Sequence, residues 1–99
     1  MNINEWTIKI DPIFESNLRS IQSRSLLETI CRKVKLLKKD PYIGKNLGPQ
    51  RPWLWEIYVG SRFRLYYEIW EKKRIIYLKA VYPRNLQKRY LRGKTTERS

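Results

Sequence analysis

Four stretches of the chain are predicted β-strands, and in two of them, residues 6–10 and 62–70, apolar and polar residues alternate with the period of two that buries one face of a strand. The first stretch is short and covers residues 6–10, where Trp, Ile and Ile alternate with Thr and Lys. The other three follow one another closely, as strands joined by hairpins do: WLWEIYV at 53–59, RFRLYYEIW at 62–70 and RIIYLKAVY at 74–82. The Gly60-Ser61 pair favours a two-residue hairpin turn with glycine at its first position.

Two amphipathic helices are expected between the first two of these strands. Asp11 fits the N-cap of the first helix, and Pro12 fits its first position, where a missing N–H costs nothing. Ser25 and Glu28 match a capping box at the start of the second helix, which runs to residue 39, before an Asp-Pro step. The apolar side chains that recur at helical spacing are Phe14, Leu18 and Ile21 in the first helix and Leu27, Ile30, Val34 and Leu37 in the second.

The resulting order of elements is β-α-α-β-β-β-α, in which residues 40–52 form a loop and residues 84–92 a short terminal helix. A helical hairpin must bury its apolar stripe, and one face of the sheet is the partner that the chain provides. We therefore predict an α+β fold, with a twisted, mainly antiparallel sheet and the helical hairpin on one face. Residues 1–93 form a single domain in this interpretation, and residues 94–99 form a flexible basic tail.

The alternation also predicts which residues share a face of the sheet. The residues expected to face the helices are Trp55, Ile57, Val59, Phe63, Leu65, Tyr67 and Ile69. The residues expected on the opposite face are Glu56, Tyr58, Arg62, Arg64, Tyr66 and Glu68. Apart from the terminal helix, no element of the chain is available to cover this polar set, so the sequence predicts an open polar face.

The charge of the chain narrows the choice of partners. Lys and Arg number 22 against 9 Asp and Glu, which gives a net charge of +13, whereas a small domain needs a net charge of only about 2–8 for solubility. Because the excess costs stability through self-repulsion, it favours a polyanionic partner such as RNA, DNA, a ribosome or an acidic protein. A basic proteome or a hot habitat would also produce such a charge. A membrane partner is not expected, because no basic amphipathic helix with Trp or Phe on a continuous apolar face is predicted.

Other features exclude whole classes of chemistry. The N-terminal residues lack a signal-peptide layout and no stretch approaches a membrane span, so a cytoplasmic location is expected. The chain has no histidine and one cysteine, which excludes zinc sites and nucleophiles activated by histidine. Cys31 falls within the second helix beside Ile30, and we expect it to be a small core residue.

Four short motifs, in this order, resemble the RelE/ParE toxin superfamily: LKKDPYIGKNLG, LWEIYVGSRFRLYYEI, AVYPR, and a tyrosine six residues beyond that arginine. The resemblance covers roughly residues 6–92 and implies the RelE-like fold. RelE-type members of this superfamily are metal-independent ribonucleases that cut mRNA in the ribosomal A site and are neutralised by an antitoxin protein. ParE-type members share the fold, poison DNA gyrase and lack the nuclease residues, so the fold alone does not decide the function.

The resemblance implies a set of catalytic residues. Arg64 matches the arginine that contacts the scissile phosphate in the nucleases, and Arg84 matches a second catalytic arginine. Tyr90 matches a tyrosine that stacks on the substrate base or assists proton transfer, and together these three favour the nuclease branch. Glu56 and Tyr58 stand where RelE has two lysines; Glu56 is a candidate general base, whereas Tyr58 weakens the case for full activity. The residues expected to contact RNA are Arg62, Tyr58, Lys33, Lys88, Arg89 and Arg92.

Two alternatives to the nuclease interpretation stay open. Arg64 with Glu68, or Arg62 with Glu56, could form ion pairs on a solvated sheet face, worth about 0.2–1 kcal/mol each. The chain could also be a non-enzymatic member, either a gyrase poison or a catalytically weak RNA- or ribosome-binding protein. The nuclease interpretation implies the toxin of a type II toxin–antitoxin system, with an acidic antitoxin, the ribosome and mRNA as partners, no membrane partner, no metal and no cofactor.

Overall fold

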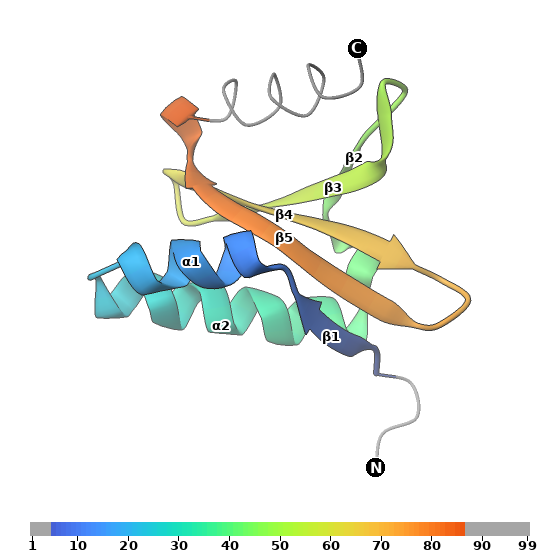
Figure 1. The fold of residues 1–99 in the computed structure, drawn as a ribbon, viewed down its shortest axis with the longest axis horizontal. Helices are drawn as coiled ribbons and strands as arrows, with labels where there is room; N and C mark the ends of the chain where they lie inside the picture. The colour runs from blue at the N-terminus through green and yellow to red at the C-terminus, as the bar shows by residue number, and fades with distance from the viewer. Residues whose placement is uncertain (1–4, 87–99) are drawn as a thin grey trace.

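The computed structural model describes residues 5–86 and contains a five-stranded sheet with two α-helices lying side by side on one side of it (Figure 1). This is the predicted α+β fold with a helical hairpin on one face of the sheet. The elements in chain order are β1 (Thr7–Ile10), α1 (Pro12–Ser20), α2 (Arg24–Lys39), η1 (Pro41–Ile43), β2 (Lys45–Leu47), β3 (Arg51–Val59), β4 (Phe63–Trp70), β5 (Ile75–Pro83) and η2 (Arg84–Leu86).

The sheet has the strand order β1-β5-β4-β3-β2. Among the strands of residues 5–86, β1 pairs in parallel with β5, and the other three pairings are antiparallel. The pairing of β4 with β5 contains an irregularity: Tyr66 lies opposite Ala80, but Tyr67 lies opposite Leu78, so Lys79 is an extra residue in β5. Such a β-bulge re-aims the side chains next to it.

The main core lies between the helices and the adjacent face of the sheet. It contains Phe14 from α1, Leu37 from α2, and Leu65 and Tyr67 from β4, each with at most 1% of its surface exposed. The Tyr67 hydroxyl donates a 2.6 Å hydrogen bond to the carbonyl oxygen of Pro41, which ties the centre of the sheet to the segment after α2. The residues predicted to face the helices all belong to this core or pack against it.

The N-cap of α1 is as predicted, and that of α2 is not. Asp11 accepts a hydrogen bond from the backbone N–H of Ile13. In α2 the cap is Ser23, whose hydroxyl accepts from the backbone N–H of Leu26, so the predicted capping box at Ser25 is wrong. Two serines two residues apart offer the same local chemistry, and the packing of the helix decides between them.

The predicted loop at residues 40–52 contains regular structure that the sequence did not indicate. Its first part forms η1, and its middle forms β2, the outermost strand of the sheet beside β3. The turn after β3 is also longer than predicted. Val59 pairs with Phe63, so three residues separate the strands, and Gly60 adopts a positive φ of 64° that favours glycine.

Cys31 is exposed, so the prediction that it is a core residue is wrong. Ile30 and Leu37 are the buried positions of α2, and Cys31 is turned about 100° away from Ile30 around the helix. The predicted terminal helix is described only as far as the short η2, and the rest of that prediction, like the tail at 94–99, lies outside the described residues. Within residues 5–86, no helix is long and apolar enough to cross a bilayer.

Candidate RNA-binding and catalytic site

The register of the sheet brings several predicted site residues together on one face. We call the face turned away from α1 and α2 the second face; it carries Leu54, Glu56, Tyr58, Arg64, Tyr66 and Tyr82. Tyr58 lies directly opposite Arg64, and Arg64 lies directly opposite Tyr82 on its other side. Directly paired residues of antiparallel strands project on the same side of a sheet. The alternation had predicted this grouping.

Three arginines gather at one end of β4 and β5. Arg62 is in the turn before β4, Arg64 is the second residue of β4, and Arg84 follows β5 directly. The backbone N–H of Arg84 donates to the carbonyl oxygen of Arg62, so these two residues are neighbours across the strand ends. Arg62 and Arg84 are exposed. This end of the sheet can therefore present two exposed guanidinium groups, those of Arg62 and Arg84, to an anion.

Arg64 is held by two contacts. Its guanidinium carbon lies 3.7 Å from the centre of the Tyr58 ring, and its Nη1 donates a 3.0 Å hydrogen bond to the carbonyl oxygen of Phe63. Arg64 exposes only 8% of its surface, whereas Tyr58 exposes 54%. A planar cation against an aromatic face is a cation–π contact.

The prediction of an open polar face is right for Arg62 and Tyr58, which are exposed, and wrong for the centre of the face. Glu56 is 4% exposed and Tyr66 is fully buried, in addition to Arg64. The second face has its own small hydrophobic cluster, in which Leu54, Tyr66 and Ala80 are buried and Leu47, Trp53 and Tyr82 pack against them. The physical reason is that this face also carries aromatic and aliphatic side chains, which pack together, and Leu47 of the unpredicted strand β2 adds to this cluster.

Glu56 lies between two strands, opposite Tyr66 of β4 and Lys45 of β2. Arg64 is its diagonal neighbour on β4, a relation within reach of long side chains. The alternative pairing of Arg64 with Glu68 does not form. Glu68 instead lies 3.8 Å from Nζ of Lys79 and accepts a hydrogen bond from the indole N–H of Trp70.

The other predicted site residues are not part of this group. Lys33 is half-buried on α2, in the layer that covers the opposite face of the sheet. The remaining four, Lys88, Arg89, Tyr90 and Arg92, lie outside the described residues. Over residues 5–86, no three acidic or cysteine side chains come together in a way that could hold a metal ion.

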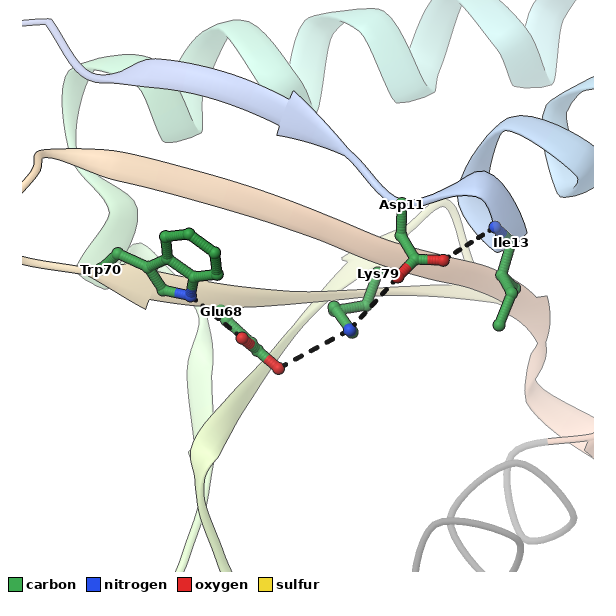
Figure 2. Close-up of polar contacts among 5 residues, drawn as sticks. All are labelled: Asp11, Ile13, Glu68, Trp70 and Lys79. Carbon is green, nitrogen blue, oxygen red and sulfur yellow. Dashed lines mark hydrogen bonds and ion pairs between the residues drawn. The ribbon is translucent and has the colours of Figure 1, made fainter.

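The sequence did not predict a polar network that forms around Lys79, on the bulged part of β5 (Figure 2). Nζ of Lys79 lies 3.3 Å from a carboxylate oxygen of Asp11 and 3.8 Å from one of Glu68, and both ion pairs are mostly buried. Because Asp11 also caps α1, the network links that helix to β4 and β5. The only signal in the sequence is a lysine within an otherwise apolar strand, and the bulge that re-aims it follows from tertiary packing.

Known proteins resemble this chain in structure but share little of its sequence. No protein-family model matches the chain, and no curated protein sequence matches it significantly. Solved structures do match. The toxin–antitoxin complex RelBE2 from Mycobacterium tuberculosis aligns with a TM-score of 0.71 and 19% identity, over 84% of this chain and 95% of that chain.

Two further structures agree. The isolated Escherichia coli RelE toxin aligns with a TM-score of 0.68 and 20% identity, over 79% of this chain and 83% of that chain. The YoeB/ParE toxin from Agrobacterium tumefaciens aligns with a TM-score of 0.63 and 13% identity, over 76% of this chain and 94% of that chain. The chain therefore has the fold of the RelE/ParE toxins, as its motifs predicted.

Proposed function

We propose that the chain is the toxin of a type II toxin–antitoxin system and that it acts as a metal-independent endoribonuclease on ribosome-bound mRNA. The observation that carries the proposal is the gathering of Arg62, Arg64 and Arg84 at one end of the sheet, on a fold shared with RelE toxins. Arginine donors in a planar fork suit phosphate oxygens. The net charge of +13 fits a polyanionic target such as a ribosome.

The reaction needs no cofactor when RNA supplies its own nucleophile. The 2′-hydroxyl loses a proton and its oxygen attacks the adjacent phosphorus, the bond from phosphorus to the 5′-oxygen breaks, and that oxygen takes up a proton. The products are a 2′,3′-cyclic phosphate and a 5′-hydroxyl. Catalysis therefore requires a base, an acid and donors for the phosphoryl oxygens, on which negative charge accumulates.

Each proposed residue has one part in this reaction. Arg64 and Arg84 donate to the phosphoryl oxygens, since an arginine stays protonated and cannot act as the base. A preorganised donor of this kind is worth about 3–4 kcal/mol, or roughly 10²–10³ in rate. Glu56 is the proposed base. Tyr90, which lies outside the described residues, is proposed to support the arginines and to donate the proton that the leaving 5′-oxygen takes up.

We also propose an acidic antitoxin as the protein partner. The matched structure from M. tuberculosis is a toxin–antitoxin complex. In this chain a cleft of about 830 Å³ opens between the helical hairpin and the ends of β3 and β5, and Ile21, Leu26, Phe63 and Val81 contribute to its lining. Apolar surface of this kind supplies affinity, and the positive charge of the chain accelerates association with an acidic partner.

A non-enzymatic function is the second candidate, and the burial of the site favours it. Arg64 and Glu56 expose 8% and 4% of their surfaces, whereas a nuclease must bring a phosphate into contact with the guanidinium. Tyr58 stands where RelE has a lysine, and the loss of that positive charge also favours this candidate. A gyrase poison or an RNA- or ribosome-binding protein of weak activity would have these features.

Mapping of mRNA ends after brief induction of the chain in cells separates the two candidates. We expect new 5′ ends in translated messages, spaced in phase with codons, and their loss in Arg64→Ala. Arg19→Ala is the matched control, since Arg19 lies on α1 in an exposed ion pair with Glu15. Codon-phased cuts that persist in Arg64→Ala contradict the proposed mechanism, and gyrase-linked DNA breaks without mRNA cuts support the second candidate.

A further inference from the structure

The contact between Tyr58 and Arg64 has a geometry that goes beyond shared burial. The guanidinium carbon lies 3.7 Å from the ring centre, close to the optimal separation of two carbon atoms, so the cation sits against the ring face. The two residues face each other directly across β3 and β4. Their relative position is therefore fixed by the backbone of the sheet as well as by the side chains.

The charged side chain of this pair is buried and the aromatic one is exposed, although a charge is normally the group that stays in water. Tyr58 is 54% exposed, and Arg64 beneath it is 8% exposed. The ring therefore shields one side of the guanidinium from water. Electrostatic interactions of the shielded group are stronger than they would be in bulk water.

The second contact restricts the same group from its edge. Nη1 of Arg64 donates to the carbonyl oxygen of Phe63 at 3.0 Å. A guanidinium has five N–H donors, and within residues 5–86 this is the one hydrogen bond assigned to it. A face contact and an edge contact together fix the plane of the fork, and they leave donor positions that can meet a phosphate.

We propose that Tyr58 is a positioning residue: its ring holds the guanidinium of Arg64 in the plane in which it binds the scissile phosphate. This inference rests on the proposed function. It also gives a physical role to a tyrosine that stands where RelE has a lysine. In this chain the position acts through Arg64, and the ring face is the part of the side chain that matters.

The kinetic test compares three variants in steady-state cleavage of mRNA on programmed ribosomes. Tyr58→Ala should lower kcat about 5- to 30-fold, the range that corresponds to a partly desolvated cation–π contact, with a smaller change in KM. Tyr58→Phe should restore most of the rate because it keeps the ring. Tyr42→Ala is the matched control: Tyr42 is a 45% exposed tyrosine outside the site, and its removal should leave kcat unchanged.

A second measurement needs no catalysis and separates failure of this inference from failure of the proposed function. In nitrogen–proton correlation spectra, the Nε–Hε signal of Arg64, assigned with Arg64→Lys, should be shifted upfield by the ring current of Tyr58. The shift should vanish in Tyr58→Ala and persist in Tyr58→Phe. A signal at the same position in Tyr58→Ala overturns the stacking.

Together, the kinetic and spectroscopic measurements distinguish failure of the positioning role from failure of the proposed function. If wild-type protein cleaves mRNA and Tyr58→Ala loses the ring-current shift while keeping kcat, the positioning role is refuted. If Tyr58→Phe loses as much rate as Tyr58→Ala, the hydroxyl and not the ring is required, and the inference is again refuted. If wild-type protein cleaves no mRNA, the proposed function fails, and with it the positioning role that rests on it, whatever the spectra show of the stacking.

Discussion

Replacement of Tyr67 by Phe removes one buried hydroxyl and leaves the ring in place. Tyr67 is fully buried in the main core, and its hydroxyl donates a 2.6 Å hydrogen bond to the carbonyl oxygen of Pro41, which is also buried. A typical hydrogen bond contributes about 0.5–1.5 kcal/mol, and a buried acceptor left without its donor costs about 1–3 kcal/mol. We therefore expect Tyr67→Phe to lower the free energy of unfolding by about 1–3 kcal/mol at pH 7.

The same substitution should change how stability depends on pH. Burial raises the pKa of Tyr67 well above its usual value near 10. Above pH 10 the hydroxyl ionises in the unfolded chain but stays protonated in the folded chain, so wild-type stability falls as the pH rises. The loss from this group is about 1.4 kcal/mol at pH 11. Tyr67→Phe lacks the group and should not show it.

The assay is urea unfolding at pH 7, 9, 10 and 11, followed by tryptophan fluorescence. Trp55 is a suitable reporter, because its ring centre lies 6.3 Å from that of Tyr67. The advantage of wild type over Tyr67→Phe should be constant up to about pH 9 and shrink by about 1.4 kcal/mol at pH 11. Titration of the other residues affects both proteins alike and cancels in the difference. Equal stabilities at pH 7 would contradict a stabilising hydrogen bond from the Tyr67 hydroxyl, and a difference that is constant to pH 11 would contradict the raised pKa of Tyr67.

Two pairs of substitutions, measured by urea unfolding, test the core and the Lys79 network. Leu37 is fully buried, so Leu37→Ala should lower the free energy of unfolding by about 2–5 kcal/mol. Leu36 is 49% exposed, so Leu36→Ala should lower it by less than about 1 kcal/mol, and similar costs would contradict the assigned core. Asp11→Ala removes a helix cap and a mostly buried ion pair and should lower the free energy of unfolding by about 1–3 kcal/mol. Glu15→Ala removes an exposed ion pair and should lower it by less than about 0.5 kcal/mol, and the reverse order would show that the Lys79 network is unimportant.

Much of the fold could be predicted because its signals are local and agree with each other. The Asp-Pro step and the apolar spacing of residues 14–21 define α1, and the alternation in residues 53–70 assigns the seven predicted core side chains to the face that packs against the helices. That assignment was inconsistent with the predicted two-residue turn. A two-residue turn would pair Tyr58 with Phe63 and move every side chain of β4 to the other face, whereas the three-residue turn pairs Tyr58 with Arg64.

The remaining features depend on contacts that no local signal carries. The strand β2 has three residues, too few for a visible alternation, and it forms because β3 offers an unpaired edge. The bulge at Lys79 and the burial of Arg64 arise from the packing of the second face, which the sequence suggested was open. The grouping of the arginines was predictable from the motifs, but the stack of Arg64 on Tyr58 was not, because it requires the register and both rotamers.

The proposed ribonuclease activity can be measured as cleavage of a defined mRNA on purified ribosomes. Wild-type protein, Arg64→Ala and Arg19→Ala are each incubated with a programmed ribosome in the presence of a metal chelator at a concentration that the ribosome tolerates, and the new RNA ends are sequenced and their chemistry identified. We predict that wild type and Arg19→Ala cleave at one position in the A site and leave 2′,3′-cyclic phosphate and 5′-hydroxyl ends. For Arg64→Ala we predict a rate roughly 10²–10³-fold lower. Ribosome-bound mRNA that stays intact with wild-type protein, or cleavage that Arg64→Ala retains in full, would contradict the proposed function.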